Sequence, residues 1–302
     1  SHADVDITTK YVRYNYTQND IVFKQLTPDE WSQNYHTIII QRDPTNLKFL
    51  KRVYPNSRFI IWLHDFYESS FWANLSKNDL QYIIDNAKLI CVSEWHKNNF
   101  KTNLELRKIE NINIDYNHFF IEDPKIPKDL KVDKYKLSFM SAGHKGLEFT
   151  LRIFEHLYKI DNKFRLYIAN PTYDQEYDFT NTKDAVINLG NVSRDEVCKH
   201  LKESLCALHL NKSYPETFGC VNAEANKMKT PVLAYDIGAT REILGEKADE
   251  QLVIPFKYRV DLHDLTFITE KILGWQIKRP IISENKNFDK KMILKKWIEI
   301  LL

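Results

Sequence analysis

Residues 215–224, PETFGCVNAE, hold two carboxylates eight positions apart, Glu216 and Glu224, with a Phe-Gly step between them. The apolar run at 205–210 predicts a strand, and the small residues after Gly219 predict a helix. The first amides of a helix have no acceptor inside it, and its dipole places positive charge there. A diphosphate could therefore bind at the mouth of this helix, with one acid before it and another one turn inside.

The two acids would then bind the two ends of a nucleotide sugar. Glu224 would accept hydrogen bonds from both ribose hydroxyls, and Glu216 would reach the sugar beyond the phosphates. The diphosphate would be bound by the amides of Phe218, Gly219, Cys220 and Val221. Gly219 has no Cβ to keep the phosphates away. On spacing alone the alternative stays open that both glutamates simply face water.

Apolar runs alternate with amphipathic stretches along the whole chain. Strands are predicted at 21–23, 36–40, 59–63, 89–92, 137–141, 164–169, 186–189, 205–210 and 231–235. Helices are predicted at 45–54, 78–86, 147–158, 193–203, 219–228 and 287–302, with Ser76 and Ser193 as N-caps. This alternation indicates parallel sheets flanked by helices, and the polar, proline-containing stretch 122–134 indicates a linker. We expect two doubly wound α/β domains with a cleft between them, and a ligand outside the carboxyl ends of the strands.

Length and composition narrow the class of protein. The 302 residues suit two domains of about 150 residues each. A net charge of +2 lacks the excess of positive charge that is typical of nucleic-acid-binding proteins. No apolar run approaches the roughly 20 residues that a membrane-spanning helix needs. The four cysteines are scattered, which favours a reducing compartment over a zinc site or a disulfide scaffold. We therefore expect a cytoplasmic protein without a nucleic-acid partner and with at most peripheral membrane contact.

All seven glycines lie at or after Gly143. Nucleotide-binding α/β domains commonly use glycine in the turn that approaches the phosphates. If the protein binds a nucleotide, its second half should hold the phosphates.

The stretch 215–244, PETFGCVNAEANKMKTPVLAYDIGATREIL, resembles the C-terminal signature of the retaining glycosyltransferases of family four. That family has the GT-B fold and shows an E-x7-E motif, a small-residue helix, and then a glycine-containing loop that ends in an acid. The acids of the motif are Glu216 and Glu224 here, and the loop acid is Glu242.

Further segments resemble the family in the same order along the chain. SFMSAGHKGLEFTLRIFEHL at 138–157 resembles its donor-phosphate loop, which implies donor binding at Gly143 and a phosphate-binding cation at Lys145. INLGNVSRDEV at 187–197 resembles its base-side turn, which implies that the backbone near Val192 meets the nucleobase. IIWLHDF at 60–66 resembles the strand that ends in an active-site histidine, here His64. The family therefore implies catalytic roles for His64, Glu216 and Lys145.

The other histidines receive a structural interpretation. These are His36, His96, His118, His156 and His209. The sequence departs from the family in three places. The opening strand and Gly-rich loop are missing, which implies either a late start or a compact member with an altered acceptor side. The family usually has an arginine a few residues ahead of the lysine, and the stretch before Lys145 has none. Cys220 follows Gly219, where other small or aliphatic residues are usual. We do not expect Cys220 to be a nucleophile, because a diphosphate would occupy the amides that lower its pKa.

The resemblance implies an acceptor-side domain at 1–133, a nucleotide-sugar-binding domain at 134–284 and a helix at 285–302 that packs back on the first domain. It implies metal-independent, retaining transfer of a sugar from a nucleoside diphosphate sugar, UDP- or GDP-linked, to a glycan or other hydroxyl acceptor. No cofactor and no metal ligand are expected. Two alternatives stay open: a sugar-nucleotide epimerase on the same fold, and a non-catalytic nucleotide- or glycan-binding module.

Overall fold

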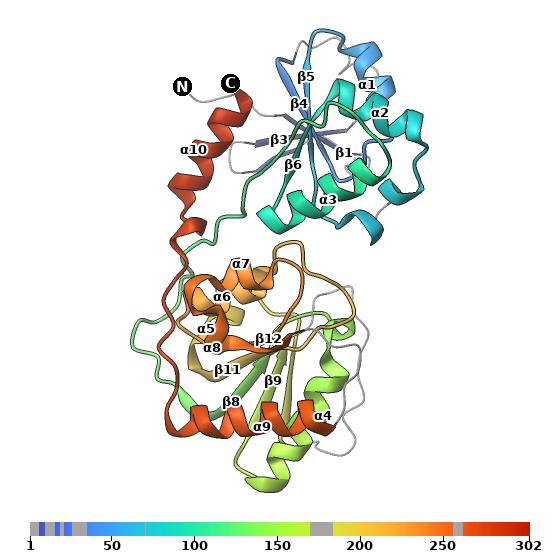
Figure 1. The fold of residues 1–302 in the computed structure, drawn as a ribbon. Coiled ribbons are helices and arrows are strands. Elements are labelled where there is room, and N and C mark those ends of the chain that lie inside the picture. The colour runs from blue at the N-terminus through green and yellow to red at the C-terminus, as the bar shows by residue number, and fades with distance from the viewer. Residues whose placement is uncertain are drawn as a thin grey trace.

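We describe the protein from a computed structural model. It describes residues 6–9, 16–18, 21–25, 35–69, 71–169, 184–255 and 262–302; for the strands before residue 35 and for 69, 253–255 and 262–263 it describes the backbone only. Figure 1 shows two α/β domains, one above the other, with the C-terminal helix beside the upper, N-terminal one.

The N-terminal domain is built on a four-stranded parallel sheet in the order β4-β5-β6-β7. Its strands are β4 (Thr37–Gln41), β5 (Arg58–Trp62), β6 (Lys88–Cys91) and β7 (Ile114–Tyr116). Its helices are α1 (Leu47–Val53), α2 (Lys77–Asn86) and α3 (Glu94–Leu106), with the 3-10 turns η2 (Tyr67–Ser69) and η3 (Phe71–Asn74).

Alternating residues of this sheet are buried on opposite faces, as a strand period of two requires. Phe59 and Ile61 pack in one core with the side chains of α1, α2 and α3. Ile60 and Ile90 face the other way and pack against Ile300 of α10 (Lys290–Leu301). The C-terminal helix thus returns to the first domain and covers the second face of its sheet.

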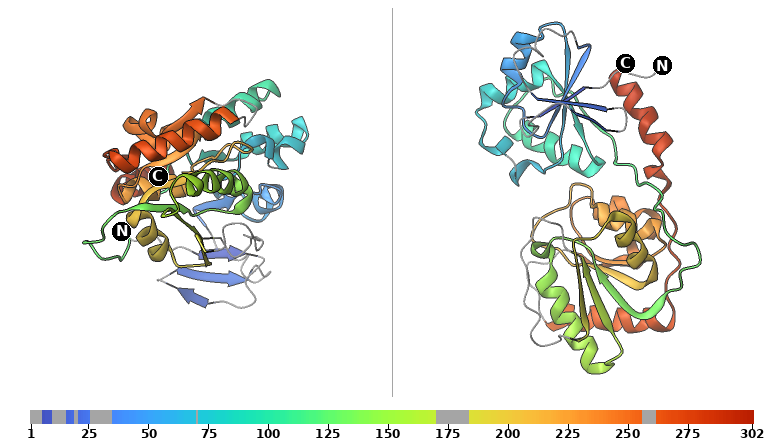
Figure 2. Two further views of the ribbon diagram at one scale, coloured as in Figure 1. Left: turned by 90° about the horizontal axis from the view of Figure 1, so that it is seen from below. Right: turned by 180° about the vertical axis from the view of Figure 1, so that it is seen from behind.

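A separate sheet of three short strands precedes this domain. Its strands are β1 (Asp6–Thr9), β2 (Tyr16–Gln18) and β3 (Ile21–Gln25), in the order β1-β3-β2. Figure 2 shows it at one side of the molecule. The strand predicted at 21–23 therefore exists, but it pairs with β1 and β2 and does not join the parallel sheet of β4 to β7.

The C-terminal domain is built on a six-stranded parallel sheet in the order β10-β9-β8-β11-β12-β13. Its strands are β8 (Asp133–Phe139), β9 (Arg165–Ala169), β10 (Val186–Gly190), β11 (Ser204–His209), β12 (Val232–Asp236) and β13 (Leu252–Pro255). The order reverses between β8 and β11, so this sheet is doubly wound and its switch point lies between these two strands.

Helices cover both faces of the C-terminal sheet (Figure 1). One core joins the sheet to α4 (Leu147–Ile160) and α9 (Leu262–Ile277). The other joins it to α5 (Arg194–Glu203), α6 (Cys220–Lys227), α7 (Thr240–Leu244) and α8 (Ala248–Gln251). The 3-10 turns are η4 (Gly143–Lys145), η5 (Gly245–Lys247) and η6 (Lys286–Phe288). None of the described helices combines the length and the apolar character that a membrane crossing requires.

Most predicted elements are present with shifted ends. Ser76 and Ser193 cap α2 and α5 as predicted, each accepting a hydrogen bond from a first-turn amide. The helix predicted at 219–228 starts one residue later, with Gly219 as its N-cap. The tail predicted as one helix from 287 contains η6 first and begins its α-helix after the cap at Asp289. The strands β1, β2, β7 and β13 and the helices α3, α7, α8 and α9 were not predicted.

Candidate functional site

A cleft of about 1030 Å³ lies between the two domains, at the carboxyl ends of β8 and β11. Its C-terminal wall comes from the loops at the switch point and from the start of α6. Its N-terminal wall includes Arg42, His64, Asp65, Phe66 and Phe119. The cleft therefore lies where a doubly wound sheet binds its ligand, and both domains contribute to it.

Lys145, Glu216 and His209 form a compact charged corner in this cleft. The Lys145 Nζ lies 2.8 Å from Glu216 Oε1, and the His209 Nε2 lies 3.4 Å from the same oxygen. Burial opposes ionisation of Glu216, but His209 and Lys145 outweigh it and lower the pKa of the carboxyl to about 2. Glu216 is thus an anion at any physiological pH and holds the lysine in place.

Two glycines allow the close packing of this corner. A Cβ on Gly146 would collide with the Leu210 carbonyl group, so only glycine lets the Lys145 turn lie against the end of β11. A Cβ on Gly238 would lie 2.5 Å from the Glu216 carbonyl oxygen and 2.6 Å from its nitrogen. Next to it, the Ala239 amide donates a 2.8 Å hydrogen bond to the same carbonyl. The loop after β12 therefore fixes the backbone of Glu216.

The mouth of α6 opens onto the cleft. Gly219 is its N-cap with φ +86°, and the amides of Asn222 and Ala223 bond to the Gly219 carbonyl. The amides of Gly219, Cys220 and Val221 precede these bonds, and all three residues line the cleft. An anion here would meet these amides and the positive end of the helix dipole.

Glu224 lies one turn further inside α6 and already has a partner. Arg194 donates from Nε to its Oε1 at 2.7 Å, and from a second nitrogen to the Glu122 carbonyl at 2.8 Å. Burial raises the pKa of Glu224 above its usual value, and Arg194 opposes this only in part. A second hollow of about 380 Å³ continues from here toward Phe120 and Ile121, and Arg194 and Glu224 line both spaces.

His64 follows β5 and lines the cleft on the side of the N-terminal domain. Burial and the charge of Arg42 lower the pKa of His64 to about 4, so its ring is neutral at pH 7. Its Nε2 is buried and has no hydrogen-bond partner among the described residues. The ring packs edge-on against Trp62 and Phe119, with centroids 4.7 and 5.4 Å away. Arg42 is itself paired with Asp65 at 2.7 Å.

The structure brings most of the predicted site residues together. The lining includes His64, Lys145, Val192, Glu216, Phe218, Gly219, Cys220, Val221 and Glu224. Gly143 lies buried in the turn η4 and is not among the lining residues. The Phe218 side chain is buried among aromatic rings of both domains, so its backbone is what faces the cleft.

Cys220 is exposed to the cleft, yet its surroundings do not favour a thiolate. The enclosing walls and the charges of Glu224 and Glu216 raise the pKa of its thiol to about 12. The thiol is therefore protonated at neutral pH, as a residue without a nucleophilic role would be.

Arg42, Arg194, Phe119 and His209 line the cleft but were not predicted there. His209, for which a structural role was predicted, lines the cleft beside Glu216 and needs correction. A polar residue at the end of the apolar run 205–210 was a usable signal, because that end opens at the switch point. Arg194 also had a signal, since a cation in the first turn of a helix opposes the dipole.

Comparison with known proteins fits this geometry. Residues 123–264 match the family model described as "Glycosyl transferases group 1", which is somewhat less than half of the chain. No curated protein matches the sequence. Among solved structures, the pneumococcal O-GlcNAc transferase GtfA in complex with UDP and GlcNAc superposes with a TM-score of 0.71 at 13% identity, over 95% of this chain and 62% of that one. The fold is GT-B.

Two further GT-B structures agree. A mutant of S. aureus TarM in complex with Fondaparinux, alpha-GlcNAc-glycerol and UDP gives a TM-score of 0.61 at 20% identity, covering 87% of this chain and 55% of that one. Anabaena HepE in complex with UDP and glucose gives 0.61 at 15% identity, covering 88% and 78%. The chain described here spans only 54% of the length of the TarM chain and 62% of the length of the GtfA chain.

Proposed function

We propose that the protein is a glycosyltransferase that moves a sugar from a nucleoside diphosphate sugar to a hydroxyl acceptor. The observation that carries this proposal is the corner where Lys145 and Glu216 meet the open mouth of α6 in the interdomain cleft. A diphosphate bound there would be balanced by the lysine and by backbone amides. Glu216 and Glu224 lie on either side of it, as the two ends of a nucleotide sugar require.

The proposed chemistry is electrostatic. As the bond from the sugar to the diphosphate breaks, negative charge grows on the phosphate oxygens, and Lys145 with the α6 amides stabilises that charge. His64, neutral at pH 7, would face the sugar from the opposite wall. Lys145 and the α6 amides would supply the positive charge that the diphosphate needs, so we propose that no metal or other cofactor is required.

We also propose retention at the anomeric carbon, with attack from the face that the diphosphate leaves. The ordered segments that resemble the retaining family support this proposal. A nucleotide sugar donor and four unpaired thiols fit a cytoplasmic location.

A thermal-shift panel of UDP-, GDP-, ADP- and dTDP-sugars tests the proposal first, because a donor that binds the native state raises its stability. We expect one nucleotide series to raise the melting temperature, with EDTA leaving the shift unchanged. Incubation of that donor with candidate acceptors, followed by NMR of the anomeric proton, then reports transfer and stereochemistry. An epimer of the donor formed without any acceptor would contradict the transferase proposal, and a shift abolished by EDTA would contradict metal independence.

A further inference from the structure

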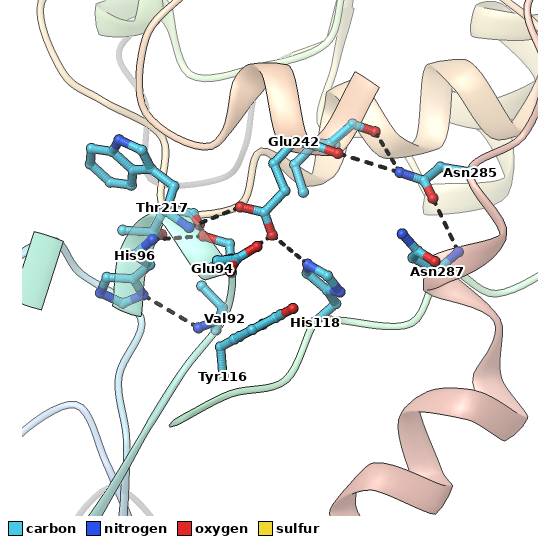
Figure 3. A network of polar contacts seen from close by, with 12 residues as sticks. Val92, Glu94, His96, Tyr116, His118, Thr217, Glu242, Asn285 and Asn287 are labelled. Carbon is cyan, nitrogen blue, oxygen red and sulfur yellow. Dashed lines mark hydrogen bonds and ion pairs between the residues drawn. The ribbon is translucent and has the colours of Figure 1, made fainter. Parts of the chain in front are cut away.

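Glu242, the acid that ends the loop after β12, does not face the cleft. Its carboxylate reaches across to the N-terminal domain and accepts hydrogen bonds from the amides of Glu94 and Trp95, each at 2.9 Å. These amides open α3, a helix of 13 residues, so the carboxylate lies at the positive end of that helix dipole. Figure 3 shows the carboxylate between the start of α3 and His118.

His118 completes this contact from the segment after β7. Its Nε2 lies 2.6 Å from Glu242 Oε1. The ring packs edge-on against Phe288, 5.2 Å away, and against Tyr116 at the same distance. Burial opposes ionisation of Glu242, but His118 and the amides of Trp95 and Glu94 lower the pKa of its carboxyl. We call Glu242, His118 and the amides of Glu94 and Trp95 the interdomain brace.

The brace lies beside the two places where the chain crosses between domains. The Ile121 amide of the first crossing bonds to the Phe288 carbonyl of the second at 3.2 Å, and Figure 1 shows the two crossings side by side at one edge. Asn285 of the second crossing donates to the carbonyls of Glu242 and Ile243. A contact between domains at this place can limit how they turn about the crossings, and a small change there would become larger across the cleft.

The same loop also fixes the site. Three residues before Glu242, Ala239 bonds to the Glu216 carbonyl at 2.8 Å. The next residue after Glu216, Thr217, donates from Oγ1 to the His64 carbonyl at 2.6 Å, and its own carbonyl accepts a 2.5 Å hydrogen bond from Ser93 Oγ. The chain of contacts therefore runs from α3 through Glu242 and Ala239 to Glu216, and through Thr217 to His64.

We propose that the interdomain brace fixes the angle between the two domains and thereby holds His64 opposite Glu216. Glu242 is then a positioning residue for the transfer reaction, and only this second statement rests on the proposed function. Glu242 is not among the residues that line the cleft, so its effect on the reaction would be indirect.

Distances between spin labels on the two domains test the brace without any ligand. A Cys220→Ser background removes the one exposed thiol. Labels at Lys101→Cys in α3 and Glu148→Cys in α4 then stand at exposed positions of the two domains. We expect a narrow distance distribution that broadens and lengthens in Glu242→Gln. The matched control is Glu246→Gln, an exposed acid four residues later, and it should leave the distribution unchanged. An unchanged distribution in Glu242→Gln would overturn the proposal.

If Glu242→Gln does not fold, His118→Asn decides in its place, because it removes the ring from the other side of the contact. A longer, broader distribution supports the brace, and the parent distribution overturns it.

Kinetics separate positioning from general damage. In Glu242→Gln we expect kcat to fall by about 100-fold, since a misplacement of about 1 Å costs that much. UDP affinity should stay at the parent value, because the proposed contacts of UDP belong to the C-terminal wall. Loss of UDP affinity together with kcat would overturn the positioning role. If the parent binds GDP, ADP or dTDP in place of UDP, that nucleotide takes its place in the test. If the parent binds none of them, the proposed function is wrong, while the spin-label distances still decide the brace.

Discussion

Glu216 and Glu224 lie eight positions apart, and the pKa values of their carboxyl groups shift in opposite directions. Their side chains are almost equally exposed, 14% and 13%, and each has a cation 2.8 or 2.7 Å away. Yet the pKa of Glu216 is lowered to about 2, and the pKa of Glu224 is raised. Burial acts alike on both acids, so the difference comes from the partners.

Glu216 has two partners, Lys145 and His209, whereas Glu224 has Arg194 alone. Two partners overcome the desolvation cost of a buried carboxylate, and one does not. Glu216, the acid beside the proposed reacting sugar, is therefore negatively charged at physiological pH. Glu224, the acid beside the proposed ribose, can accept hydrogen bonds from further donors. We expect removal of the Glu216 charge to cause the larger loss of function.

Glu216→Gln should give the largest effect. It removes the charge that holds Lys145, and with it the stabilisation of the leaving diphosphate, so we expect transfer to fall about 100- to 1000-fold. The measurement is kcat for the donor found in the thermal-shift panel. Glu270→Gln, an exposed acid on α9, serves as the control and should keep parent activity. Parent-like activity in Glu216→Gln would contradict the catalytic role that we propose for Glu216.

Glu224→Gln should act mainly on donor affinity. The ribose stays bound in the ground state and in the transition state, so its contacts lower KM and leave kcat nearly alone. Loss of a hydrogen bond to a charged group costs about 1.5–3 kcal/mol, which predicts a rise in KM of about 10- to 100-fold. Initial-rate kinetics give both constants. A fall in kcat with unchanged KM would reverse the roles given to the two acids.

Stability should respond with opposite signs to the same two substitutions. Glu216 has a depressed pKa, so its contribution to the free energy of unfolding is present above pH 4.5 and is lost as the pH falls toward 2. At 1.4 kcal/mol per pKa unit, this amounts to about 3 kcal/mol at pH 7. Glu224 has a raised pKa, so the folded state binds its proton more tightly and its ionisation costs stability once the pH rises through the folded pKa.

Urea unfolding at pH 7 checks these signs. We expect Glu216→Gln to lower the free energy of unfolding and Glu224→Gln to leave it unchanged or raise it. In Glu216→Gln the acid dependence below pH 4.5 should also become shallower than in the parent. Equal losses in both variants would mean that burial, and not the number of partners, sets the energetics of the two acids.

The sequence was enough to predict both acids but not their difference. Their spacing, the glycine between them and the strand-helix alternation are local properties, and the resemblance to a known family located Lys145. The second partner of Glu216, His209, lies at the end of a strand where the apolar pattern predicts a core residue. Its role follows only from the switch point between β8 and β11, which a linear pattern does not reveal.

Contacts between distant segments were the hardest to predict. Glu242 was recognised as an acid at the end of a loop, but its partners Glu94 and His118 lie more than 120 positions earlier in the chain. Arg42 lies just past the carboxyl end of β4, and its place in the cleft depends on how the two domains face each other. Domain arrangement is set by summed weak contacts, and no single residue pattern encodes it.

Arg194→Gln should give the smallest effect. It tests Glu224 most directly, because Arg194 is the one cation among the described residues that pairs with that acid. Without the guanidinium, burial acts unopposed on Glu224, and its pKa rises further. In the variant Glu224 therefore takes up its proton at a higher pH than in the parent. Where this added protonation occurs, UDP should bind about 2- to 5-fold more weakly than to the parent, equivalent to about 0.5–1 kcal/mol.

Where Glu224 is ionised in both proteins, Arg194 no longer competes for the carboxylate in the variant, so UDP should bind at least as tightly as to the parent. Isothermal titration over a pH series measures this, with the exposed Arg152→Gln as the control. Equal weakening at every pH would show that Arg194 binds the nucleotide directly, and that its contact with Glu224 does not govern the ribose end of the site.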